Sequence, residues 1–296
     1  MQSTLAYEFQ GLEAQTPVNA FCLDHQTSYA AQTIKQDTVI TRCDLKETQA
    51  IATGDKIQLR NLVNVQSLSL IRSAPALSFI VCGQPTDSNG QLGAPELWWV
   101  SFNGDEKDVQ PHIFKITHLE SANITGTPLP EPVIGAVSAL SSDRSELVIM
   151  VLDKAQHLQC SVYKRSQVEK LIEQMTEKGD TEVEAGDFNM MEAVYQSFKP
   201  TAKQLDPATI GSIQSIAFSN GRAIYATKSY GEQHAVSKGF WLLKNGFHDQ
   251  PVEQLPAHTE LTGIALLGKY VYFGLSQESD GKFLNTIHHA EKALWN

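Results

Sequence analysis

The sequence has little positive charge and no long apolar run. Its 296 residues carry 23 Lys and Arg against 33 Asp and Glu, which gives a formal net charge of −10. Nucleic-acid binding relies on a basic surface, so this balance argues against nucleic acid as a partner. The longest apolar stretch, residues 147–152, has the length of a strand and is far shorter than the roughly 20 residues that span a bilayer. We therefore expect a soluble protein with no membrane span.

The sequence also lacks the short motifs of nucleotide, phosphate and zinc sites. The adjacent histidines His288 and His289 would point to opposite faces of a strand and could not bind one ion together. We expect no metal and no cofactor. The few cysteines have no C-x-x-C spacing and lie in apolar runs, where a free thiol packs as a small hydrophobic group. We expect four buried thiols, with a Cys22–Cys43 bridge as the alternative; the four are Cys22, Cys43, Cys82 and Cys160.

A repeated pattern of short strands dominates the chain. Runs of strand length are separated by clusters of Gly, Pro, Asn, Asp and Ser, which is typical of all-β proteins. A unit of three or four strands recurs, with first strands beginning near residues 18, 65, 137, 212 and 261. Recurrent antiparallel units of this size predict the blades of a propeller. We predict a single β-propeller domain over residues 1–296, with five blades; a pair of β-sandwiches is the alternative.

The N-terminal segment is predicted to close this propeller. Residues 3–9 place Leu5, Tyr7 and Phe9 on one face of a strand. An open edge strand invites aggregation, so a propeller must tie its ends together. We therefore predict that this strand completes the last blade beside residues 284–290.

One segment has a helical pattern instead. Ser166 and Glu169 have the S-x-x-E spacing of a capping box. Apolar residues then recur at helical spacing to about residue 178, and Gly179 ends the pattern. A second short helix is expected within residues 185–199. We predict a helical insertion at about residues 165–200, between the third and fourth blades.

Adjacent Trp98 and Trp99 must face opposite sides of their strand. We expect them, and Trp241 in the fourth repeat, to pack between neighbouring blades. A stacking platform for sugar rings is the alternative, and it requires an exposed indole.

Propeller geometry predicts where a ligand would bind. Loops from the second to the third strand of a blade, and from each outermost strand to the next innermost one, converge on one face. The loops from the second to the third strand are long and polar in the second, fourth and fifth blades. Long loops on a rigid scaffold often carry binding function. A solvated loop without a ligand is the alternative at each position. The candidate ligand contacts are Asp87, Asn89, Gln91, Tyr230, Glu232, His234 and Glu278.

Five segments follow one another in a characteristic order around the predicted helix: ALSSDRSELVIMVLD, QCSVYKRSQVEKLIEQM, GSIQSIAFSNGRAIYATKS, LTGIALLGKYVYFGLSQ and LNTIHHAEKAL. This order of elements resembles the helveticin J family of class III bacteriocin-like proteins. The resemblance implies an antibacterial protein that recognises a cell-envelope glycan or another surface polymer. It provides no catalytic motif.

The first ten residues lack the basic and apolar regions of a signal peptide. A bacteriocin-like protein would then be secreted by another route, and otherwise the protein would be cytoplasmic.

We therefore expect a non-enzymatic propeller whose polar loop face binds carbohydrate. Surface hydroxyls and amides fit this ligand, because Ser, Thr, Asn and Gln together outnumber the charged residues. Three alternatives remain: a lectin-like or toxin-associated propeller that does not kill, a propeller hydrolase acting on a glycan or ester, and an interaction scaffold. The hydrolase requires a carboxylate or histidine with a perturbed pKa in a pocket.

Overall fold

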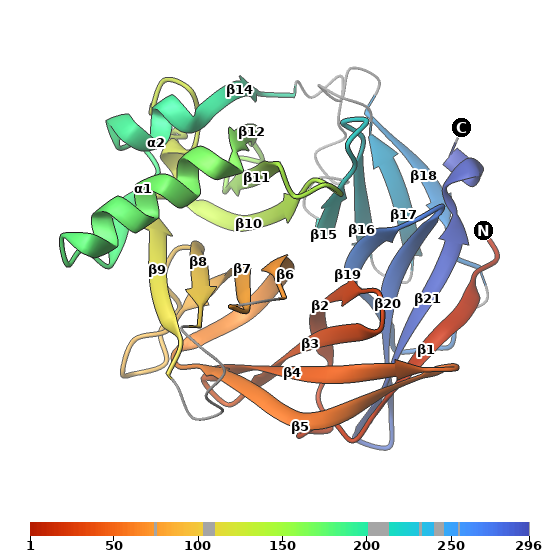
Figure 1. Cartoon of the computed structure of the whole chain (residues 1–296). Coiled ribbons are helices and arrows are strands. Elements are labelled where there is room, and N and C mark those ends of the chain that lie inside the picture. The colour runs from red at the N-terminus through yellow and green to blue at the C-terminus, as the bar shows by residue number, and fades with distance from the viewer. Residues whose placement is uncertain are drawn as a thin grey trace.

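The computed structural model describes residues 1–73, 76–102, 110–200, 213–230, 233–239, 246–253 and 255–295. Strands make up most of this part of the chain, and both α-helices within it lie in one region (Figure 1). This confirms the predicted all-β class. None of the described helices has the length and apolar character needed to cross a membrane.

The largest sheet has eight strands and contains both the first and the last strand of the chain. In spatial order they are β19 (Thr259–Leu267), β20 (Tyr270–Ser279), β21 (Lys282–Glu291), β1 (Thr4–Gln10), β5 (Gln49–Leu59), β4 (Asp37–Lys46), β3 (Thr27–Ile34) and β2 (Val18–Asp24). The sheet consists of two antiparallel halves joined by parallel pairing between β1 and β5. Strand β1 pairs with β21, from Thr4 opposite His289 to Glu8 opposite Thr286. The predicted pairing of the N-terminal strand with residues 284–290 is confirmed.

Three further sheets complete the strand architecture of the described residues. One contains β6 (Leu62–Arg72), β7 (Ser78–Pro85), β8 (Glu96–Ser101), β9 (His112–Thr117) and β13 (Glu182–Glu184). The second contains β10 (Val133–Leu140), β11 (Glu146–Asp153), β12 (Leu158–Lys164) and β14 (Val194–Phe198), and the third β15 (Ile213–Phe218), β16 (Ile224–Tyr230), β17 (Gln233–Gly239) and β18 (Phe247–Pro251). Consecutive strands pair as antiparallel hairpins, as the repeated units predict.

The first strand of each repeat lies at the centre of the molecule. Strand β2 contacts β6, β6 contacts β10, β10 contacts β15, β15 contacts β19, and β19 returns to β2. The sheets therefore radiate from a closed ring of innermost strands, as Figure 1 shows. The arrangement is propeller-like.

Apolar side chains fill the spaces between neighbouring sheets. Trp98 packs in a buried cluster with Leu59 and Phe79, and Trp99 packs in another with Ile80 and Leu147. The two indoles thus face opposite sides of β8, and both are buried. This confirms the predicted packing between sheets for this pair. Trp241 lies outside the described residues.

The helical insertion lies within the third repeat, which corrects its predicted place between the third and fourth. Helix α1 (Arg165–Glu177) follows β12, and α2 (Phe188–Ala193) precedes β14. Strand β14 then returns to pair with β12, so the insertion joins two strands of one sheet. Between the helices, β13 pairs in parallel with β9 of the neighbouring sheet.

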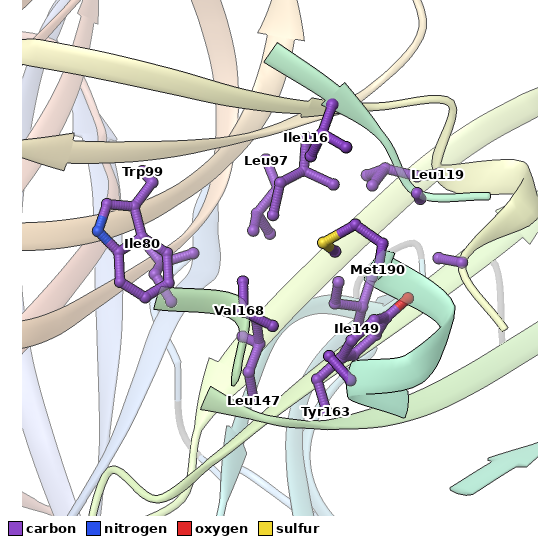
Figure 2. Packing of buried hydrophobic residues seen from close by; sticks show 14 of the residues in the cluster. Ile80, Leu97, Trp99, Ile116, Leu119, Leu147, Ile149, Tyr163, Val168 and Met190 are labelled. Atoms are coloured by element: carbon purple, nitrogen blue, oxygen red, sulfur yellow. The ribbon is translucent and has the colours of Figure 1, made fainter. Parts of the chain in front are cut away.

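Both helices contribute to the core between these two sheets. Val168 of α1 and Met190 of α2 are fully buried against strand residues such as Ile116 and Tyr163 (Figure 2). The insertion therefore covers apolar surface that the two sheets would otherwise expose to solvent.

The predicted capping box does not form. The residue at the N-cap of α1 is Lys164, which makes no capping bond with its side chain. Glu169 forms ion pairs with Arg165 and Arg72 instead, the latter at 2.5 Å. The predicted C-terminus is confirmed, since Gly179 has a φ of +91° and the amides after the helix bond to its last carbonyls.

The four cysteines are free and buried, so the predicted thiols are confirmed and the alternative Cys22–Cys43 bridge is not formed. Burial raises the pKa of the Cys82 thiol to about 12, because the protein interior disfavours a thiolate. The other three thiol pKa values are raised for the same main reason. These groups pack as apolar side chains and do not act as nucleophiles at neutral pH.

Candidate functional site

One cavity along the described residues has a volume of about 760 Å³ and opens at the amino ends of β15 and β19. Pro17, just before β2, also lines it. The amino ends of three innermost strands therefore meet at this opening. The polar side chains that line it are Gln214, Ser229, His234, His258, Thr259, Glu260 and Glu278, and the apolar ones include Leu255, Pro256, Leu261 and Phe283.

One wall of this pocket contains a serine–histidine pair. Ser229 of β16 and His234 of β17 are direct cross-strand partners. Their Oγ and Nδ1 atoms lie 3.0 Å apart, within hydrogen-bond distance. Burial lowers the pKa of His234, while the nearby Glu260 carboxylate acts in the opposite direction. The imidazole is thus largely neutral at pH 7 and offers a hydrogen bond to a ligand.

Another part of the lining carries two carboxylates on one face of a strand ladder. Glu260 pairs with Ser276, Glu278 follows two residues later, and Glu278 pairs with Phe283. Cross-strand partners share a face, so all four side chains point to the same side of the sheet. The hydrogen bond of 2.6 Å between Ser276 and its partner Asn285 fits this register. Glu260 and Glu278 are diagonal neighbours, with about 7–8 Å between the bases of their side chains.

The charge of the pocket is negative. Its described lining contains both of these glutamates and no Lys or Arg. Both carboxylates are solvent-exposed, so each is available to a ligand entering the cavity.

Two of the predicted ligand residues line this pocket. His234 and Glu278 both line the pocket. Asp87, Asn89 and Gln91 lie in the connection between β7 and β8 and do not line it. Tyr230 ends β16, but its side chain and the whole of Glu232 lie outside the described residues.

The β7–β8 connection is folded on itself. One carboxylate oxygen of Asp87 accepts hydrogen bonds from the backbone amides of Asn89 and Gln91, each at 2.8 Å. These bonds, that of Gln91 first, lower the pKa of Asp87 because they stabilise the charged form. Much of the hydrogen-bonding capacity of this carboxylate therefore serves the turn itself.

Sequence reasoning missed Ser229, His258, Glu260 and Phe283. A signal for one of them was present, because His258 lies between β18, an outermost strand, and β19, the next innermost one. Loops of that kind were expected on the ligand face, although all the predicted contacts lie in loops of the other kind. Ser229, Glu260 and Phe283 become visible only from the register of their hairpins.

A second cavity of about 470 Å³ lies at the carboxyl ends of the innermost strands. An ion pair of 3.4 Å between Arg144 and Asp24 spans two of the repeats that line it. Both charges of this pair are therefore engaged within the protein, as is the Asp143 carboxylate in the same lining, which accepts hydrogen bonds from Ser141 and Ser145. No group of three potential metal ligands comes together in the described part of the chain.

Comparison with solved structures shows the fold of this chain in other proteins. The tail fiber of Staphylococcus aureus phage P68 matches with a TM-score of 0.60 at 11% identity, covering 98% of this chain and 52% of the fiber chain. The chain thus spans about half the length of that fiber. A GH43_1 enzyme from Xanthomonas citri, in complex with xylotriose, matches with a TM-score of 0.53 at 9% identity, covering 98% and 89% of the two chains. At these identities the likeness shows the propeller-like fold alone.

Among curated proteins, none matches this chain in sequence. The family model described as bacteriocin helveticin-J matches residues 1–277. This match covers nearly the whole chain and confirms the resemblance drawn from the order of its strands and helix. The protein therefore belongs to the helveticin J family.

Proposed function

We propose that this protein is a non-enzymatic, bacteriocin-like antibacterial protein that recognises a carbohydrate of the bacterial cell envelope. The observation that carries the proposal is the pocket at the amino ends of β15 and β19, where polar groups and one aromatic ring face a single cavity. Membership of the helveticin J family supports the antibacterial part. We further propose that its fold is a five-bladed propeller, with one blade for each innermost strand of the central ring.

The lining of the pocket suits a sugar. Saccharides present hydroxyls to polar side chains and an apolar ring face to an aromatic side chain. Here Ser229, His234 and Gln214 offer hydrogen bonds, while Phe283 offers a ring beside the Glu278 carboxylate. A volume of about 760 Å³ lies within the usual range for small-ligand sites. The fold likeness to a xylotriose-bound enzyme supports the same ligand class.

A hydrolase acting on a glycan is the second candidate. The presence of Glu260 and Glu278 in one pocket favours it, because glycosidases use two carboxyl groups that flank the bond to be cleaved. In that case Glu278→Gln would abolish release of reducing sugar from envelope glycans while leaving binding intact. Wild-type protein that binds these glycans without releasing reducing sugar would support the non-enzymatic proposal.

The proposal is tested on lawns of a broad panel of bacteria. We expect wild-type protein to clear at least one strain, and the double variant His234→Ala, Phe283→Ala to need at least tenfold more protein. His118→Ala serves as the matched control, since this exposed histidine does not line the pocket. Equal melting temperatures would show that all three proteins are folded. Clearing by the double variant at the wild-type dose would place killing elsewhere on the protein.

A further inference from the structure

The two carboxylates of the pocket differ from the acidic groups near it. Asp249 pairs with Lys228 at 2.9 Å, and Glu253 pairs with the N-terminal ammonium at 2.8 Å. Within the described part of the chain, neither Glu260 nor Glu278 takes part in a salt bridge. The pocket therefore presents two carboxylates that form no ion pair with a Lys or Arg of its described lining, which contributes His234 and His258 as its basic side chains.

The two charges can act on the same ligand atom. Their side chains rise from one face of the β19–β20 ladder, with about 7–8 Å between their bases. Each glutamate has three rotatable bonds, so the two carboxylates can converge on a cation held between them. Phe283 lies directly opposite Glu278 on the same face, so the same ligand would have an aromatic surface beside its charge.

We propose that this pocket selects a saccharide with an unsubstituted amino group, which binds as an ammonium between Glu260 and Glu278 while the sugar ring packs on Phe283. This inference rests on the proposed carbohydrate-binding function. An ammonium has three donors and no acceptor, and its hydrogen bonds to carboxylates are stronger than those between neutral groups. N-acetylation removes the charge and two of these donors.

The same charges disfavour polyanionic glycans. A phosphate or uronate brought beside two carboxylates is repelled, and the repulsion grows in a partly enclosed site where water screens less. The net charge of −10 over the whole chain acts in the same direction. Selectivity for an amino sugar thus combines attraction of the ammonium with repulsion of the anionic alternatives.

The experiment compares a glucosamine oligosaccharide with its fully N-acetylated counterpart by titration calorimetry, at about pH 6, where the sugar amine carries a proton. We expect the free amine to bind at least tenfold more tightly to the wild-type protein. The double variant Glu260→Gln, Glu278→Gln should lose this preference and bind both sugars alike. Asp280→Asn is the matched control, because it removes a charge in the same hairpin outside the pocket lining.

The outcomes separate this inference from the proposed function. If the wild type binds both sugars equally, the amino-sugar inference is overturned. If Phe283→Ala also weakens that binding, carbohydrate binding by this pocket remains in place. Binding of neither sugar would overturn the amino-sugar inference, while binding of cell-wall polysaccharide would still decide the proposed function. Loss of the preference in Asp280→Asn as well would show that overall charge, and not the pair of glutamates, causes it, and would overturn the inference. Melting temperatures check that each variant is folded.

Discussion

Leu5 of the first strand pairs with His288 of the last strand, so the two ends of the chain share one sheet. Close by, Ser3 Oγ lies 3.1 Å from His288 Nδ1. On its other edge, β1 pairs in parallel with β5, which joins the first and last repeats. The N-terminal strand therefore closes the ring of sheets.

Removal of this strand should destabilise the whole domain. Deleting residues 1–10 exposes the edges of β21 and β5 and removes Phe9 from its buried cluster. Loss of one large buried side chain alone costs about 3–5 kcal/mol, so we expect a fall in melting temperature of many degrees or failure to fold. Differential scanning calorimetry measures it. A melting temperature equal to that of the full chain would contradict closure by β1.

The helical insertion should contribute to stability through its buried residues alone. Met190→Ala removes a fully buried side chain between two sheets and should lower the free energy of unfolding by about 2–5 kcal/mol. Phe188→Ala, on the same helix but 66% exposed, should change it by less than about 0.5 kcal/mol. Urea unfolding followed by circular dichroism compares the two. Similar values for both variants would mean that α2 does not pack as described.

Stability should fall on mild acidification. Burial lowers the pKa values of His234, His288 and His289 in the folded protein, whereas the hydrogen bond with Glu120 raises that of His118. For the first three, the unfolded chain binds more protons around the ordinary histidine pKa of about 6.5, so stability rises with pH there. His118 opposes this trend. Because its pKa is raised in the folded protein, the stability that it contributes is present below the ordinary histidine pKa and is lost as pH rises.

The net effect is measured by urea unfolding at about pH 7.5 and about pH 5.5, on either side of the ordinary histidine pKa. We expect a lower unfolding midpoint at the lower pH. The change should be smaller in His288→Gln and larger in His118→Gln. Identical midpoints for the wild type at both pH values would show that the three half-buried imidazoles do not control stability in this range.

The elements that sequence reasoning predicted well depend on local patterns. Alternation along single strands placed Trp98 and Trp99 on opposite faces, and the spacing of repeats located all five innermost strands. Helix α1 followed from its apolar spacing and from Gly179. In contrast, the capping box failed because the helix begins at Arg165, which places Ser166 inside its first turn, and Glu169 pairs with arginines instead.

The candidate site was predicted only in part, because it depends on register and long-range contacts. His234 and Glu278 were identified from their long polar loops, and both line the pocket. Glu260 reaches the same pocket only because β19 pairs with β20 in one particular register. The insertion was misplaced for the same reason, since its return to β12 depends on the short strand β14.

The central claim is that the pocket at the amino ends of β15 and β19 binds an envelope carbohydrate. The most direct test is the binding of purified cell-wall polysaccharide from a sensitive strain to immobilised protein. We predict saturable binding by the wild type and by His118→Ala, and at least a tenfold weaker affinity for His234→Ala, Phe283→Ala. Equal affinity of all three proteins, or no binding of the polysaccharide by the wild type, would contradict the claim.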